Sequence, residues 1–181
     1  MTEPAVGTAL RLARTDDAPA VAALLRGNWP FLAPYEPERD EHYFTAEGQE
    51  ALLRDALAEH AAGRAVPYVI EHDGELVGRL TVSGIVRGAA QSADVGYFVA
   101  EAVNGRGVAT NAVAALLGIA FADGPGGLGL HRLQAGTLLS NSASQAVLQR
   151  NGFERIGVAR RYLRIAGRWQ DHVLYQRVAA T

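Results

Sequence analysis

The hydrophobic and polar positions of the chain switch repeatedly between a period of two and a period near 3.6, which predicts strands and helices. The predicted strands cover residues 10–12, 66–71, 75–85, 91–99, 130–139, 153–165 and 168–178. The predicted helices cover residues 15–27, 47–62, 108–121 and 140–150. This order of elements is typical of an α/β layer fold with a mixed sheet.

Residues 28–37 interrupt the pattern with three prolines among aromatic side chains. Proline lacks a backbone N–H and fixes φ, so we expect neither a regular helix nor a central strand here. A loop of this kind either covers a hydrophobic core or contacts a ligand.

The most informative segment is Asn104-Gly105-Arg106-Gly107-Val108-Ala109-Thr110, which joins a predicted strand to a predicted helix. Glycine lets a backbone approach a ligand closely, and a helix N-terminus presents unpaired N–H groups to an anion. The segment therefore predicts a main-chain cradle for phosphate or pyrophosphate. A glycine-rich turn without a ligand is the simpler alternative.

Two nucleotide-binding motifs do not fit this segment. A dinucleotide fingerprint requires a third glycine where Thr110 stands. A Walker loop requires a lysine, and all 17 basic residues of this chain are arginine.

Composition places the chain among globular proteins, with 181 residues, 49% hydrophobic and 20% charged. We expect one domain over residues 8–178, with short termini at 1–7 and 179–181. No apolar run reaches the roughly 20 residues of a membrane span, and the first residues lack a signal peptide's pattern. A cytoplasmic protein without a membrane partner is therefore expected.

Cysteine is absent, which excludes disulfides and a covalent thiol intermediate. The five histidines show no metal-ligand spacing, so we expect no metal and interpret each as a surface or satisfied side chain. Residues 1–75 carry a net charge of −8 and residues 76–181 carry +6. An acidic half could attract a cationic amine and a basic half a phosphorylated cofactor, although solvated helix faces explain the charges equally well. The sequence pI near 6.2 disfavours nucleic acid as the main ligand.

A second motif follows the predicted strand 130–139. It reads Asn141-x-x-Ser144-x-x-Val147-Leu148-x-x-x-Gly152-Phe153. It resembles the Asn-x-x-Ala/Ser…Leu-Tyr-x-x-x-Gly-Phe segment of the GCN5-related N-acetyltransferases (GNAT). Segment 104–109 likewise resembles that family's Gln/Arg-x-x-Gly-x-Gly/Ala loop for coenzyme A, with Asn104 in place of Gln or Arg. The two motifs come in the family's order.

This resemblance implies a GNAT fold: a mixed, mostly antiparallel sheet of about seven strands, flanked by helices and splayed between the fourth and fifth strands. Residues 31–37 and 94–97 resemble the RimJ/RimL-type ribosomal-protein N-terminal acetyltransferases, as does Ser144. Besides Asn104, there are two further departures from the family. Leu148 stands where many members carry an acidic tyrosine, and Arg161 lies where RimL-like enzymes place a glutamate proposed as base.

The resemblance also implies a reaction, direct acetyl transfer from acetyl-CoA to an amine, and it assigns the cofactor-binding residues. Main-chain N–H groups of the loop would hold the pyrophosphate, and the end of the strand 91–99 would pair with the pantetheine arm. Asn141 would bond pantetheine, cap its helix, or do both, and Ser144 would give a proton to the departing thiolate. Arg106 would contact phosphate or simply be exposed. The expected cofactor-binding set is Phe98, Val99, Asn104, Gly105, Arg106, Gly107, Val108, Ala109, Thr110, Asn141 and Ser144.

The acceptor end is less determined by the sequence. We expect the acceptor against the aromatic segment, whose walls and carboxylate suit a cationic amine; the residues are Trp29, Phe31, Tyr35 and Glu36. The amine must lose a proton, and Asp94 is the first candidate for the base. Glu36, Glu41 and His42 remain open as bases.

Three functions compete at this point. The first is protein N-terminal acetylation of the RimJ/RimL type, with a ribosomal protein as acceptor. The second is acetylation of a small-molecule amine such as an antibiotic or polyamine, and the third is acyl-CoA sensing without catalysis. A homodimer stays open. The arginine-only basic set and the abundance of alanine favour a GC-rich bacterial genome.

Overall fold

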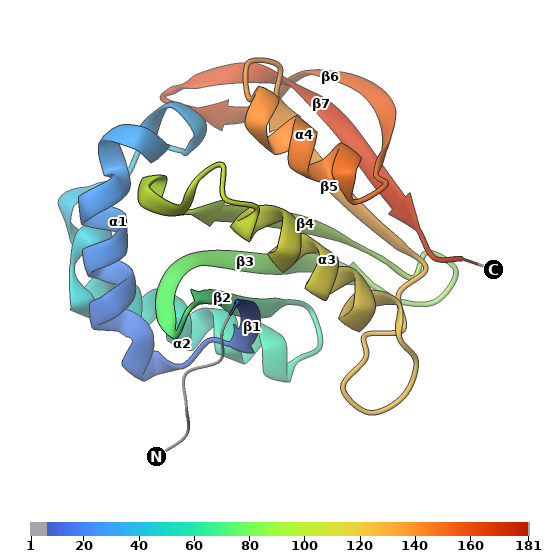
Figure 1. The fold of residues 1–181 in the computed structure, drawn as a ribbon, viewed down its shortest axis with the longest axis horizontal. Coiled ribbons are helices and arrows are strands. Elements are labelled where there is room, and N and C mark those ends of the chain that lie inside the picture. The colour runs from blue at the N-terminus through green and yellow to red at the C-terminus, as the bar shows by residue number, and fades with distance from the viewer. Residues whose placement is uncertain (1–6, 181) are drawn as a thin grey trace.

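The computed structural model describes residues 7–180, so most of the expected tail 1–7 and Thr181 lie outside the described residues. Seven strands form one sheet in the order β1-β2-β3-β4-β5-β7-β6 (Figure 1). The strands are β1 (Thr8–Leu12), β2 (Val66–His72), β3 (Glu75–Val86), β4 (Ser92–Val99), β5 (Arg132–Leu138), β6 (Glu154–Ile165) and β7 (Arg168–Val178). The helices are α1 (Ala18–Leu32), α2 (Ala46–Ala61), α3 (Val108–Phe121) and α4 (Ser142–Arg150). The predicted α/β order is confirmed.

One strand pair distinguishes this sheet from a simple antiparallel one. β4 and β5 run parallel, and they are joined only at their starts, by three residue pairs that end at Asp94↔Gln134. Beyond that point the two strands diverge, as Figure 1 shows. The other neighbours pair antiparallel. The predicted mixed sheet, splayed between its fourth and fifth strands, is therefore confirmed.

Side chains on successive strand positions point to opposite faces, and the helices cover both faces. Val66, Tyr68 and Ile70 of β2 belong to the main core, which also contains buried residues of α3 and Leu148 of α4. Val69, between them in the sequence, packs instead with Leu53 of α2 on the opposite face. In Figure 1, α3 and α4 lie in front of the sheet and α2 behind it.

Two turns between neighbouring antiparallel strands fold as their sequences require. Asp73 and Gly74 have φ values of 52° and 83°, and Ala166 and Gly167 have 47° and 76°. Two consecutive residues with positive φ give the type I′ geometry that suits the twist of a hairpin. Gly152, with φ of 72°, follows the end of α4 in the left-handed conformation common after helices.

The prediction for residues 28–37 is wrong in its first half. Helix α1 does not end near Gly27 but continues through Pro30 to Leu32, and a 3-10 turn, Ala33–Tyr35, follows it. Pro30 removes one helical hydrogen bond, at a cost of about 3 kcal/mol. Packing offsets this cost, because Leu25 and Leu32 are buried in one cluster with Tyr43, and Trp29 packs against that cluster. Sequence periodicity alone could not weigh those distant contacts.

Within residues 7–180, no helix is both long enough and apolar enough to cross a membrane.

Candidate active site

A cavity of about 880 Å³ opens where β4 and β5 diverge. Its walls come from the end of α1, the diverging halves of β4 and β5, the starts of α3 and α4, and the β6–β7 pair. The structure brings most of the predicted site residues together in this one lining: Phe31, Tyr35, Glu36, Phe98, Val99, Asn104, Gly105, Gly107, Val108, Ala109, Thr110, Asn141 and Ser144.

The start of α3 forms one end of this cavity. Gly105 and Gly107 have φ values of 76° and 83°, which residues with a Cβ adopt rarely, and a Cβ at either position would meet no atom within 4 Å. Among the described residues, no side chain caps α3. The backbone N–H groups of its first turn therefore face open space, and with the helix dipole they form a site for an anion.

The side chains of this loop take smaller parts. Oδ1 of Asn104 accepts a hydrogen bond from the N–H of Gly105 at 3.1 Å, which shapes the loop from within. Arg106 is exposed and does not line the cavity. A direct contact between Arg106 and phosphate therefore stays a prediction.

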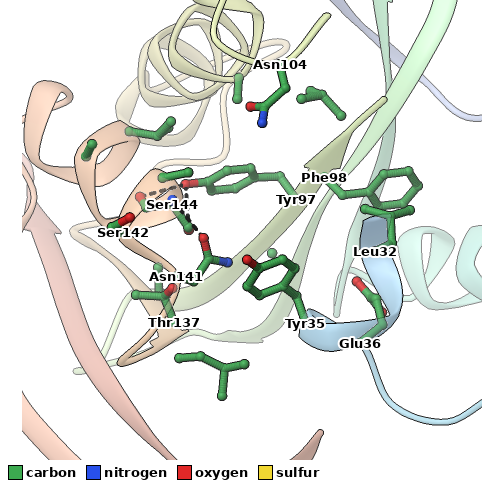
Figure 2. A pocket seen from close by; sticks show the side chains of 18 of the residues that line it. Leu32, Tyr35, Glu36, Tyr97, Phe98, Asn104, Thr137, Asn141, Ser142 and Ser144 are labelled. Atoms are coloured by element: carbon green, nitrogen blue, oxygen red, sulfur yellow. Dashed lines mark hydrogen bonds between the residues drawn. The ribbon is translucent and has the colours of Figure 1, made fainter. Parts of the chain in front are cut away.

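The start of α4 faces the same space. Oδ1 of Asn141 accepts a hydrogen bond from the N–H of Ser144 at 3.0 Å, so the predicted capping role is confirmed. Oγ of Ser144 lies 3.1 Å from the hydroxyl of Tyr97, which also donates to the carbonyl oxygen of Ser144 at 3.3 Å. Figure 2 shows Tyr97 pointing from β4 across the cavity wall to the start of α4.

Tyr97 is a site residue that the sequence did not single out. Burial raises the pKa of its hydroxyl to about 12, although the hydrogen bond with Ser144 opposes that rise. The group thus stays protonated at neutral pH and can donate to Ser144. Leu148, where the family often has tyrosine, is fully buried in the main core and does not line the cavity.

The edge of β4 supplies the strip between the two helix ends. Phe98 and Val99 lie beyond the last β4–β5 pair, so within residues 7–180 this edge has no strand partner. Their other edge pairs with Arg79 and Gly78 of β3. A Cβ at Gly78 would overlap the carbonyl oxygen of Phe98, so glycine at that position is what allows this edge its course.

The cavity reaches both faces of the sheet. Its lining includes the neighbours Tyr97 and Phe98, and successive strand residues point to opposite faces. Tyr97 reaches α4 on one face. Phe98 packs on the opposite face with the cluster of Leu32 and Tyr43. Figure 2 shows this division, with Phe98 beside Leu32 and with Tyr35 and Glu36 reaching in from the end of α1. We call the α3/α4 side the donor half and the α1 side the acceptor half.

Glu36 is the carboxylate of the cavity lining, and it lies in the acceptor half. Burial raises the pKa of Glu36, while the charges of Arg39 and Arg79 oppose the rise. An Nη2 of Arg39 lies 3.8 Å from Oε2 of Glu36, and the Arg39 guanidinium also covers the ring of Tyr43. The main-chain oxygen of Glu36 accepts from the N–H of Ala166 at 3.0 Å, which ties this segment to the β6–β7 turn.

Besides Arg106, four predicted residues are not part of this lining. Trp29 packs against Phe44 with ring centroids 4.8 Å apart, and with Glu41 it borders a separate shallow hollow. His42 is exposed in the turn before α2. Asp94 lies on β4 where β4 and β5 are still paired, and its side chain is exposed. The protein around it still removes part of the water from its carboxylate, which raises its pKa.

Two buried polar residues, one on β5 and one on β7, line the cavity without having been predicted. Thr137 is buried, and its Oγ1 has no hydrogen-bond partner within the described part of the chain. His172 is buried as well, and its Nδ1 lies 3.0 Å from the carbonyl oxygen of Gln170. A single threonine or histidine on an alternating strand gives no sequence signal, so neither could have been found from the sequence alone.

Known proteins resemble this chain over nearly its whole length. It is 34% identical to a probable N-acetyltransferase, YjcK, of Bacillus subtilis, covering 86% of this chain and 85% of that protein. It is 32% identical to the [ribosomal protein uS5]-alanine N-acetyltransferase of Escherichia coli, covering 91% and 84%.

A solved structure agrees with these relatives. Mycobacterium smegmatis RimJ, in complex with CoA-disulfide, is 36% identical and superposes with a TM-score of 0.91, covering 97% of this chain and 84% of that one. The family model described as acetyltransferase (GNAT) domain matches residues 8–154. The chain therefore belongs to the GNAT family and is an N-acetyltransferase.

Proposed function

We propose that this protein transfers the acetyl group of acetyl-CoA to the N-terminal α-amine of a protein, with a ribosomal protein as the acceptor class. The observation that carries the proposal is the cavity that crosses the splayed sheet. It offers an anion site on one face and an aromatic, acidic pocket on the other. A donor on one face and an acceptor on the other can thus meet between the two diverging strands.

The donor half fits coenzyme A in shape and in chemistry. The first-turn N–H groups of α3 would take the pyrophosphate, and the open space beside Gly105 and Gly107 leaves room for it. The unpaired edge at Phe98 and Val99 would hydrogen-bond the pantetheine arm as a missing strand would. The amide nitrogen of Asn141 would reach the same arm, since its oxygen already caps α4.

Holding the thioester and the amine together is the main catalytic effect we assign to the protein. A main-chain N–H near Phe98 would stabilise the oxyanion that forms on the thioester carbonyl. Ser144 would donate a hydrogen bond or a proton to the departing thiolate, and Tyr97 would support its hydroxyl.

The acceptor half suits a cationic N-terminus. Phe31, Tyr35 and Glu36 surround the position where the amine would enter, and Trp29 is left out because it packs elsewhere. The Escherichia coli relative is named for acetylating alanine of a ribosomal protein. That name supports a protein N-terminus as the acceptor here.

The test is release of CoA thiol with a panel of acceptors. Peptides that begin with alanine or serine should react, and the same peptides with a blocked N-terminus should not. Preference for a polyamine or an aminoglycoside would contradict the acceptor class. Tight CoA binding without turnover on any amine would contradict the reaction and support a sensor.

A further inference from the structure

His172 is the one histidine among the described residues of the cavity lining. It lies on β7, between Leu138 of β5 and Ala159 of β6 in the ladder. Its neighbour Val173 belongs to the main core with α3 and α4. Because alternate strand residues point to opposite faces, His172 points to the acceptor half.

The hydrogen bond of the ring decides which nitrogen carries the proton. Nδ1 of His172 lies 3.0 Å from the carbonyl oxygen of Gln170. A carbonyl oxygen can only accept, so Nδ1 donates, and in the neutral ring Nε2 carries a lone pair. Across residues 7–180, Nε2 makes no hydrogen bond. It is also not one of the fully buried side-chain nitrogen and oxygen atoms that lack a partner. Nε2 is therefore a basic nitrogen without a protein partner, on a residue that lines the cavity.

The surroundings hold this ring in place. The β6–β7 pairing shifts between Ala159 and Leu163, and the extra residues place Tyr162 against the imidazole, with ring centroids 5.6 Å apart. Asp171 fixes the bulge by accepting from the N–H of Arg161 at 2.8 Å, where Arg161 has a φ of 49°. Gly136 lies beside the ring on β5, where a Cβ would come within 3.8 Å of it, an ordinary contact distance.

We propose that Nε2 of His172 is the base that takes a proton from the acceptor amine. The proposal rests on the acetyl transfer proposed above. Histidine is the side chain used most often for such a transfer near neutral pH. Glu36 lies in the same half, but its carboxylate faces Arg39 and suits recognition of the ammonium ion. Asp94, the first candidate from the sequence, does not line the cavity.

The protons balance as follows. The acceptor enters as an ammonium ion and gives one proton to Nε2 of His172, which passes it to solvent. The neutral nitrogen then attacks the thioester carbonyl carbon, the C–N bond forms, and the C–S bond breaks with its electron pair on sulfur. The second proton of nitrogen leaves as the thiolate becomes a thiol. The sum is one amide, one CoA thiol and one released proton.

Two variants separate a base from a structural residue. His172→Asn keeps an N–H donor at the position of Nδ1, so it can still bond Gln170, but it has no basic nitrogen. His172→Ala leaves a space that free imidazole can enter. His60→Ala is the matched control, because its Nδ1 also bonds a carbonyl oxygen, that of Ala65 at 3.2 Å, but it lies outside the cavity.

We expect His172→Asn to lower kcat/KM by about 10²–10⁴-fold with the Kd for acetyl-CoA unchanged in calorimetry. Imidazole should raise the rate of His172→Ala and leave His60→Ala and the original protein unchanged. Wild-type turnover by His172→Asn, loss of acetyl-CoA binding in step with turnover, or no response of His172→Ala to imidazole would each overturn the proposal.

The two proposals fail in different ways. If the original protein acetylates a small amine but no peptide, the acceptor class is wrong, and the same variants assayed with that amine still decide the role of His172. If peptides are acetylated and His172→Asn is as active as the original protein, only the base is wrong.

Discussion

At the scale of single residues, neighbouring groups set the pKa and the hydrogen bonds of the hydroxyl and carboxyl groups in the cavity. The hydroxyl of Tyr97 reaches both Oγ and the carbonyl oxygen of Ser144, so it restricts the rotamer of that serine. Glu36 is held partly buried, with the charges of Arg39 and Arg79 opposing the rise in its pKa. In both cases burial disfavours the charged form, so the pKa of each group is raised.

Removing the Tyr97 hydroxyl should lower turnover through Ser144. We expect Tyr97→Phe and Ser144→Ala each to lower kcat by about 10-fold or more, with little change in KM for acetyl-CoA. If Tyr97 acts through Ser144, the double variant should be no slower than Ser144→Ala. Effects that multiply in the double variant would show that the two hydroxyls act independently.

Glu36→Gln should weaken acceptor binding and stabilise the fold. The pKa of Glu36 is raised in the folded state, so its favourable contribution is complete below the ordinary pKa and is lost as pH rises through the folded value. Near pH 7 the variant should therefore unfold at higher urea than the original protein, with the difference fading toward pH 4. Its KM for a peptide acceptor should rise.

The exposed Glu75, at the start of β3, offers the control for that variant. Glu75→Gln should change neither quantity. An unchanged peptide KM in Glu36→Gln would remove Glu36 from the acceptor site.

At the scale of elements, three termini meet at the divergence of β4 and β5. The starts of α3 and α4 supply N–H groups and the Asn141 cap, and the end of α1 supplies the aromatic wall. Helices α3 and α4 owe their starts to local signals, namely Gly107 in the left-handed region before α3 and the Asn141 cap of α4. The meeting point of the three termini depends on the sheet, which holds them around one opening.

A carboxylate in the α3 cradle should abolish acetyl-CoA binding. In Gly107→Glu, the left-handed φ costs about 1–2 kcal/mol, and the new charge occupies the space open to phosphate. Calorimetry should show no binding while circular dichroism stays that of a folded protein. Gly88→Glu is the control, since Gly88 also has positive φ and open surroundings but lies outside the cavity. Unchanged affinity in Gly107→Glu would refute the cradle.

At the scale of the whole molecule, the sheet consists of two parts joined at a short seam. Strands β1 to β4 form one part and β5 to β7 the other, and three residue pairs connect them. Beyond the seam, toward the ends of β4 and β5, the strand edges at 95–99 and 135–138 face the cavity and do not pair with one another. A ligand placed there contacts both parts and should stabilise their union.

Coenzyme A should therefore protect both strand edges from amide hydrogen exchange. At 100 times its Kd it should add about 2.7 kcal/mol to the free energy of unfolding, and exchange at residues 95–99 and 135–138 should slow. Adenosine 3′,5′-bisphosphate, which lacks the pantetheine arm, should protect only the start of α3. Equal protection by both ligands would show that the pantetheine arm does not lie between the strand edges at 95–99 and 135–138.

Features that depend on neighbours along the chain followed from the sequence. The element order, the glycines of the α3 cradle and the Asn141 cap all involve residues a few positions apart, where residue type fixes backbone geometry directly. The resemblance of two such motifs to a family then indicated the splayed sheet and acetyl transfer.

Only the tertiary structure decided the features that join distant segments. Tyr97 contacts Ser144, which is 47 positions away in the sequence. Helix α1 continues past Pro30 because its buried side chains pack with Tyr43. His172 faces the acceptor half because of its position in the sheet. No local pattern encodes such contacts, because their free energies come from burial and pairing that exist only once the chain has folded.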